Sequence, residues 1–165
     1  MRSSLMATAA ISVLLTACAG TAPDHAMMTE SVTNAGAHPI TIVPMGEYRT
    51  GMLDEGAAEI PAFDPVSKRI FVVNGADKAI DILDMSNPDK LSKLGALELA
   101  TWGKGANSVA VKNGVVAVAV ENENKQAPGK AVFFDTEGNF IASVTVGALP
   151  DMIKFSPDGK YVLVA

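Results

Sequence analysis

A strand–turn–strand pattern that recurs along the chain limits most strongly the folds this sequence can adopt. The segments "EIPAFDPVSKRIFVV", "NSVAVKNGVVAVAV" and "DMIKFSPDGKYVLVA" each contain an apolar strand, a turn rich in Pro, Asp, Asn or Gly, and a strongly apolar second strand. The turns follow Phe63, Val111 and Phe155, which are 48 and 44 residues apart. A repeat with a period in the forties indicates an array of similar structural units.

Further strand candidates fill the space between these hairpins. Residues 60–63, 69–73 and 79–84 predict strands separated by turn residues, and Asn113-Gly114 is a strong signal for a tight hairpin. Another strand pair flanks the turn at 136–139. The segment "KLSKLGALELATW" is compatible with a strand or with one helical turn. Because strands come about every 8–12 residues and helical periodicity is absent beyond the amino terminus, we expect an all-β fold.

A β-propeller explains the repeat better than a β-sandwich does. A period in the forties with about four strands per unit is typical of propeller blades, whereas sandwiches rarely repeat the same strand–turn–strand text at a fixed spacing. Residues 39–165 hold fewer than three such units, and propellers typically have about four to eight blades. We therefore expect an incomplete propeller of roughly two and a half four-stranded blades, from the amino-terminal part of a longer protein truncated at its C-terminus.

The amino terminus has the layout of an export signal. "MRSSLMATAAISVLLTACAG" carries one positive charge, at Arg2, followed by an apolar stretch that is too short to span a bilayer. Leu15-Thr16-Ala17-Cys18 resembles the lipobox of bacterial lipoproteins, and Cys18 is the only cysteine in the chain. We predict a signal peptide at 1–17, lipidation of Cys18 and a flexible tether at 18–38. An ordinary cleaved signal that happens to contain a cysteine is the alternative.

The position after the cysteine bears on location. Ala19 stands where lipoproteins retained at the inner membrane of Gram-negative cells tend to carry Asp. The resemblance therefore implies an outer-membrane protein that faces the periplasm, if the source is Gram-negative. The formal net charge of −5 and the absence of a basic run argue against nucleic acid as a partner.

Three segments carry a family resemblance: "FDPVSKRIFVVNGADKAIDILDMSNP", "GANSVAVKNGVVAVAVE" and "PGKAVFFDTEGNFIASVTVGALPDMIKFSPDGKYVLVA". Together they resemble the opening of the choice-of-anchor I family, from about residue 46 to residue 165. The resemblance implies a seven-bladed propeller with YVTN-type repeats, similar in layout to WD40 proteins, in an exported protein held at the cell surface. It carries no catalytic motif onto this stretch.

Acidic loop residues are the candidate ligand groups. Carboxylates are ligands that Ca²⁺ prefers, so an acidic cluster near residue 55 could bind this ion, although a solvated loop is the simpler interpretation. The "ENENK" loop could bind a ligand at a blade rim or be simply a polar loop, and Asp151 could face the central channel or cap a turn. Trp102 could stack on a ligand or pack between blades. The candidate residues are Asp54, Glu55, Glu59, Glu121, Glu123 and Asp151.

No arrangement for nucleophilic catalysis is visible in the sequence. The single cysteine is assigned to the lipid, and His25 and His38 lie in or at the edge of the tether, so no nucleophile and base can be paired. The sequence favours a binding or scaffold module, anchored to a membrane by lipid, whose ligand is an envelope protein, a glycan or a small molecule. A fragment of a propeller hydrolase of phosphoesterase or lactonase type is the alternative, and a truncated product without activity is a third.

Overall fold

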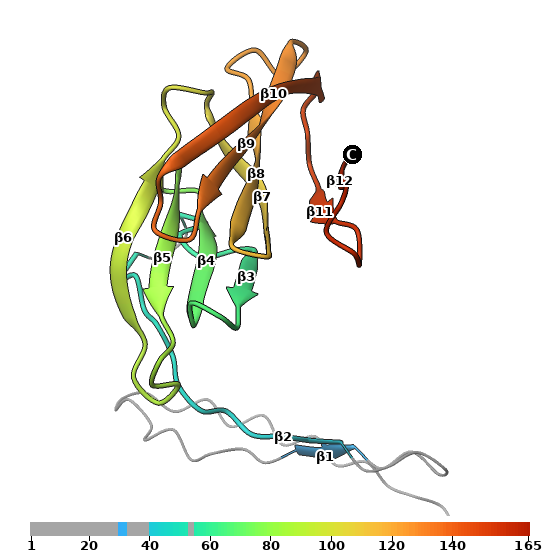
Figure 1. Cartoon of the computed structure of the whole chain (residues 1–165). Helices are drawn as coiled ribbons and strands as arrows, with labels where there is room; N and C mark the ends of the chain where they lie inside the picture. The colour runs from blue at the N-terminus through green and yellow to red at the C-terminus, as the bar shows by residue number, and fades with distance from the viewer. Residues whose placement is uncertain (1–29, 33–39, 53–54) are drawn as a thin grey trace, which may run out of the picture. The chain divides into compact units, whose positions relative to one another are not determined.

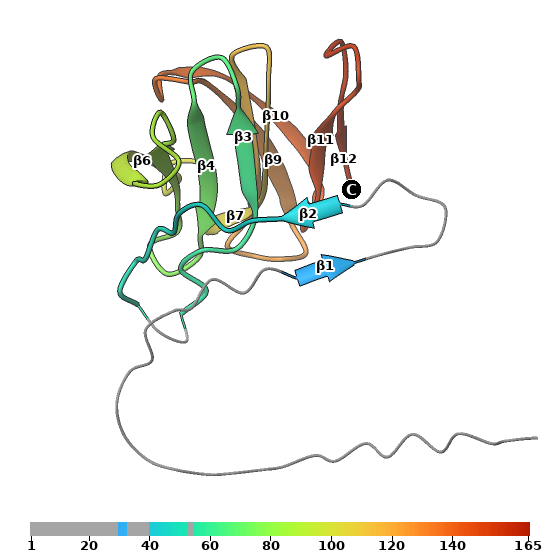
Figure 2. The same cartoon turned by 90° about the horizontal axis from the view of Figure 1, so that it is seen from below.

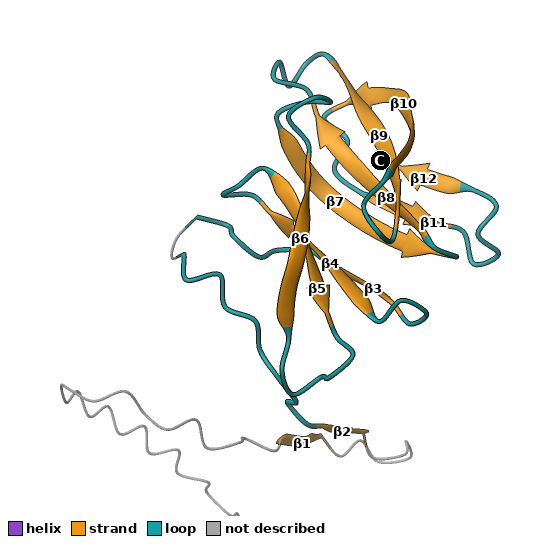
Figure 3. Cartoon of the chain, turned by 60° about the vertical axis from the view of Figure 1, so that its left-hand side comes forward, coloured by secondary structure: helices purple, strands orange, loops and turns teal. Residues whose placement is uncertain are grey.

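The computed structural model describes residues 30–32, 40–52 and 55–165, which form strands and loops without a helix (Figure 3). The chain divides into two units, Met1–Pro44 and Met45–Ala165. In the first unit, β1 (Glu30–Val32) pairs antiparallel with β2 (Ile40–Ile42). β1 falls within the segment expected to be a tether, whereas the predicted signal peptide and Cys18 lie outside the described residues.

The second unit begins with a four-stranded antiparallel sheet, here called blade 1 (Figure 1). Its strands follow one another in sequence order, each pairing with the next. The segment that was compatible with a strand or a helical turn forms the fourth strand. The strands are β3 (Pro61–Asp64), β4 (Arg69–Asn74), β5 (Ala79–Asp84) and β6 (Ser92–Glu98).

Blade 2 repeats this topology, and a third hairpin follows it. Figures 1 and 2 both place this hairpin beside blade 2, on the side away from blade 1. The strands of blade 2 are β7 (Gly105–Lys112), β8 (Val115–Glu121), β9 (Pro128–Asp135) and β10 (Phe140–Ala148). The hairpin consists of β11 (Ile153–Phe155) and β12 (Val162–Val164).

The first strand of each unit lies at the inner edge of the array. β3 contacts β7, and β7 contacts β11, whereas β10, the last strand of blade 2, is exposed along almost its whole length. Repeated four-stranded meanders whose first strands adjoin are the arrangement of a β-propeller, and two stacked sheets of a sandwich would not give it. The all-β, incomplete propeller of roughly two and a half blades is thus confirmed.

The alternation of valine and alanine along β8 builds two different interfaces between units. Successive side chains of a strand point to opposite faces, and β8 is buried on both. Val116, Val118 and Val120 join a large core that includes Phe71 and Ile80 of blade 1. The alanines on the opposite face of β8 belong to a smaller core that includes residues of the third hairpin.

The third strand of the first blade is buried more deeply than its sequence indicates. The segment "DILDM" alternates apolar and polar residues, which is typical of a half-buried strand, yet β5 is buried at every position except its last. β5 lies between β4 and β6, and both its faces are covered, so its polar side chain at Asp81 is only 1% exposed. The apolar and polar residues that alternate along β5 therefore lie on two opposite faces, both of them buried.

Candidate functional site

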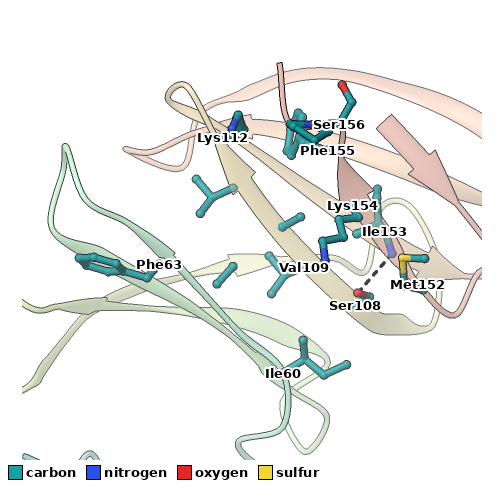
Figure 4. A pocket seen from close by; sticks show the side chains of 14 residues that line it. Ile60, Phe63, Ser108, Val109, Lys112, Met152, Ile153, Lys154, Phe155 and Ser156 are labelled. Carbon is teal, nitrogen blue, oxygen red and sulfur yellow. Dashed lines mark hydrogen bonds between the residues drawn. The ribbon is translucent and has the colours of Figure 1, made fainter. Parts of the chain in front are cut away.

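The inner strands of the three units line a cavity with a volume of about 560 Å³ (Figure 4). It is lined by residues of β3, β7 and β11 and by residues next to these strands. In a propeller the innermost strands surround the central channel. These strands therefore form part of the channel wall, and the cavity lies along it. We refer to it below as the channel cavity.

Apolar side chains make up much of the wall. Ile60, Phe63 and Met152 are among them and remain 40%, 47% and 44% exposed, respectively. Val109 of β7 and Phe155 of β11 complete the apolar surface between the strands. The cavity therefore presents uncovered apolar area, which is the usual lining of a ligand site.

Two lysines are the charged residues of this wall, Lys112 on β7 and Lys154 on β11. Among the described residues that line it, none is a carboxylate. Figure 4 shows the Lys154 side chain extending from β11 toward β7. No ion pair of Lys154 is found within the described residues, whereas Lys112 lies near Asp158, on the turn of the third hairpin.

Both hydroxyls at the cavity take part in hydrogen bonds within the protein. Ser108 Oγ accepts a hydrogen bond from the backbone N–H of Ile153 at 3.3 Å, which ties β7 to β11. Ser156 Oγ donates to Asp158 Oδ1 and accepts from the backbone N–H of Tyr161. The bond from Ser156 is the main cause that lowers the pKa of Asp158, and the charge of Lys112 contributes least.

A second, polar pocket of about 230 Å³ brings together two of the predicted ligand residues. Glu59 and Glu121 come from segments that are far apart in the sequence, and both line this pocket, together with Lys78 and Lys104. Glu121 is buried, and its carboxylate lies 3.3 Å from Lys104 Nζ and 3.9 Å from Lys125 Nζ. Because lysines already balance this carboxylate, an added cation would have to compete with them.

The remaining candidates do not gather at one place. Glu55 and Glu123 are exposed, and Asp54 lies outside the described residues. Asp151 is exposed and donates its backbone N–H to the carbonyl of Ala165, and the channel cavity includes its neighbour Met152 instead. Within residues 30–32, 40–52 and 55–165, no group of three or more His, Cys, Asp or Glu side chains could hold a metal ion.

Trp102 has the packing role that was one of its two interpretations. Its ring stacks on Phe140 with the centroids 5.2 Å apart and meets Phe134 edge-on at 5.3 Å. The tryptophan lies between β6 and β7, so this aromatic cluster joins the connection between the blades to the outer strands of blade 2.

Sequence reasoning missed a buried ionic cluster inside blade 1. Lys93 Nζ lies 2.8 Å from Asp81 Oδ1, and Asn74 Nδ2 donates to Asp81 Oδ2 at 3.3 Å and to Asp77 Oδ2 at 3.0 Å. The hydrogen bond to Asp81 raises the pKa of Lys93 above its ordinary value. An aspartate followed at a distance by a lysine gives no signal in sequence, because the pair forms only when β5 and β6 adopt their register.

Comparisons with known proteins agree with this architecture. The sequence pattern of the choice-of-anchor I domain matches residues 59–165. The chain belongs to the choice-of-anchor I family. No curated protein matches the sequence.

Among solved structures, a chain of the Kuenenia stuttgartiensis hydrazine synthase is similar, with a TM-score of 0.54 and 17% sequence identity. The similarity covers 65% of this chain and 29% of the hydrazine synthase chain, so it extends over less than a third of that protein. At this identity, the likeness concerns the fold alone. In the described part of this choice-of-anchor I protein, no helix is long and apolar enough to cross a membrane.

Proposed function

We propose that this choice-of-anchor I protein is a lipid-anchored binding module of the cell envelope, and that it binds a small ligand in the channel cavity. The observation that carries the proposal is the cavity of about 560 Å³ on the inner strands β3, β7 and β11. A concave, largely apolar site with a few convergent polar groups is the usual form of a small-molecule site.

The folded unit favours binding over catalysis. The polar side chains at the channel cavity are two lysines and two serines, and both serine hydroxyls already take part in hydrogen bonds within the protein. A nucleophile needs a base within hydrogen-bond reach, and the described residues that line the cavity include no histidine or carboxylate for this purpose.

The anchor rests on the sequence Leu15-Thr16-Ala17-Cys18. Several acyl chains on one cysteine would hold the protein stably, because each buried CH₂ contributes about 0.8 kcal/mol. Residues 19–38 would then separate the propeller from the lipid surface, and Ala19 would direct a Gram-negative protein to the outer membrane.

Cell fractionation with metabolic labelling tests the anchor. The wild-type protein should partition with membranes and incorporate radioactive palmitate. Cys18→Ala should remove the label and release the protein to the soluble fraction, while Ala19→Ser, a matched change beside the cysteine, should leave both unchanged. Membrane retention of unlabelled Cys18→Ala protein would refute lipidation.

A ligand screen by NMR tests the binding site. A fragment library is added to ¹⁵N-labelled protein, and shifted backbone amides are mapped onto the strands. We expect hits to move amides of β3, β7 and β11. Hits that map only to the polar pocket of Glu59 and Glu121 would place the site elsewhere. Turnover of phosphoester or lactone substrates that is abolished by a chelator would favour the hydrolase alternative and overturn the proposal.

A further inference from the structure

We infer that the ligand of the channel cavity is an amphipathic organic anion, with one carboxylate on an apolar body, and that Lys154 is its counter-ion. The inference rests on the proposed binding function and narrows it to one chemical class. Three properties of the wall support it: its charge, its apolar area and the small number of its uncommitted polar groups.

The charge of the wall has one sign. The protein as a whole is acidic, with a formal net charge of −5, yet the described residues that line the channel cavity include two lysines and no carboxylate. Lys112 lies near Asp158, although the ion pair of this carboxylate is with Lys160, at 3.9 Å. Lys154 has no ion pair within the described residues, and its side chain extends along the cavity wall (Figure 4). An anion at this place would gain a charge-assisted contact without displacing an internal partner.

The apolar area requires a ligand with an apolar body. Ile60 and Met152 present 40% and 44% of their surface, although they line a concave site, whereas the ring of Phe63 points away from β7 and β11 in Figure 4. Covering such surface contributes roughly 25 cal/mol per Å² of apolar area removed from water. A simple inorganic anion would leave this apolar surface exposed to water, and its binding would gain no free energy from burial of that surface.

The polar groups of the wall disfavour two other ligand classes, glycans and phosphate esters. A glycan would require many hydrogen-bond partners, whereas the hydroxyl of Ser156 is engaged as donor and acceptor and that of Ser108 already accepts one hydrogen bond. A phosphate ester is usually held by several donors, often in the planar fork of an arginine, and the wall includes no arginine. The ammonium of Lys154, beside apolar side chains, matches a single carboxylate.

A pair of ligands that differ only in charge tests the inference. ¹⁵N-labelled protein is titrated with 4-phenylbutyrate and, in parallel, with 4-phenylbutan-1-ol, and the amide shifts of residues 108–112 and 152–156 are followed. We expect saturable shifts with both ligands and a dissociation constant about threefold to fivefold lower for the carboxylate, the effect expected of one partly exposed ion pair. The advantage should shrink in 0.5 M NaCl, since salt screens exposed charges.

Substitutions assign the effect to one residue. Lys154→Gln should weaken phenylbutyrate to the level of the alcohol and leave the alcohol unchanged, while Lys154→Arg should retain the preference. Lys90→Gln, in the exposed loop between β5 and β6, is the matched control and should change neither. If both ligands bind in the cavity with equal affinity, the anion inference fails and the proposed binding site survives. If neither shifts these amides, the inference is refuted, and the fragment screen decides the proposed function separately.

Discussion

Replacement of Lys93 by methionine tests whether the buried ion pair stabilises blade 1. Methionine keeps most of the length and the apolar stem of lysine but removes the ammonium. The ammonium lies 2.8 Å from Asp81 Oδ1, and apart from it this buried oxygen has no hydrogen-bond partner in the described part of the chain. In Lys93→Met, the carboxylate would keep only the amide of Asn74, at 3.3 Å.

The expected loss follows from the burial of the two partners. Removing one partner of a fully buried ion pair costs about 3–5 kcal/mol, because it leaves an uncompensated charge. The side chain of Asp81 is 2% exposed but that of Lys93 is 37% exposed, so water can reach the site from the lysine side. We therefore expect Lys93→Met to lower the free energy of unfolding by about 2 kcal/mol, a large part of the roughly 5–15 kcal/mol typical of a domain.

Urea unfolding at pH 7 measures this loss as a decrease in the midpoint of about 1 M, with the slope unchanged. Asp81→Asn combined with Lys93→Met removes both charges, so the double variant should be more stable than Lys93→Met alone. Lys90→Met, which changes an exposed lysine of the preceding loop, should stay within about 0.5 kcal/mol of the wild type. A loss below about 0.5 kcal/mol for Lys93→Met, or additive losses in the double variant, would refute the reasoning.

Two further predictions concern packing and pH. Gly129→Ala should destabilise the protein by about 1–3 kcal/mol, because an added Cβ would lie 2.5 Å from the ring of buried Pro150. Gly147→Ala is the control, because nothing lies within 4 Å of the added Cβ, and it should be neutral or slightly stabilising. Equal losses of stability in the two variants would contradict this packing. The hydrogen bond from the Asn139 side chain lowers the pKa of Asp135, so its contribution to stability is present above the unfolded pKa and is lost as pH falls through the folded pKa. Urea midpoints should therefore show Asp135→Asn less stable than the wild type at pH 7, with a gap that closes below about pH 4; a gap that stays constant in acid would show that charge is not involved.

The sequence predicted the architecture well because strands and turns are local features. The hairpins around Phe63, Val111 and Phe155 begin the three units, as the sequence repeat predicted. The strand β6 was ambiguous because, as the last strand of its sheet, most of its residues are partly or fully exposed, and such a strand shows no clear alternation.

The candidate site could be predicted only in part, because it depends on contacts between units. Nothing in the sequence near Glu59 or Glu121 indicates that both residues line one pocket, because the pocket forms only when blade 1 packs against blade 2. Lys154 gave no signal either, because a lysine on a short strand is an ordinary surface residue until the neighbouring strands surround it. The channel cavity is thus a property of the assembled repeats.

The alternating valines and alanines of β8 also fix the order of the repeats. The valine face meets large side chains of blade 1, and the alanine face meets the third hairpin. If the two neighbours of blade 2 were exchanged, small side chains would face one partner across a void and bulky ones would crowd the other. The units are therefore similar in backbone but not interchangeable. The size of the side chains on each face of β8 determines which neighbouring unit can pack against that face.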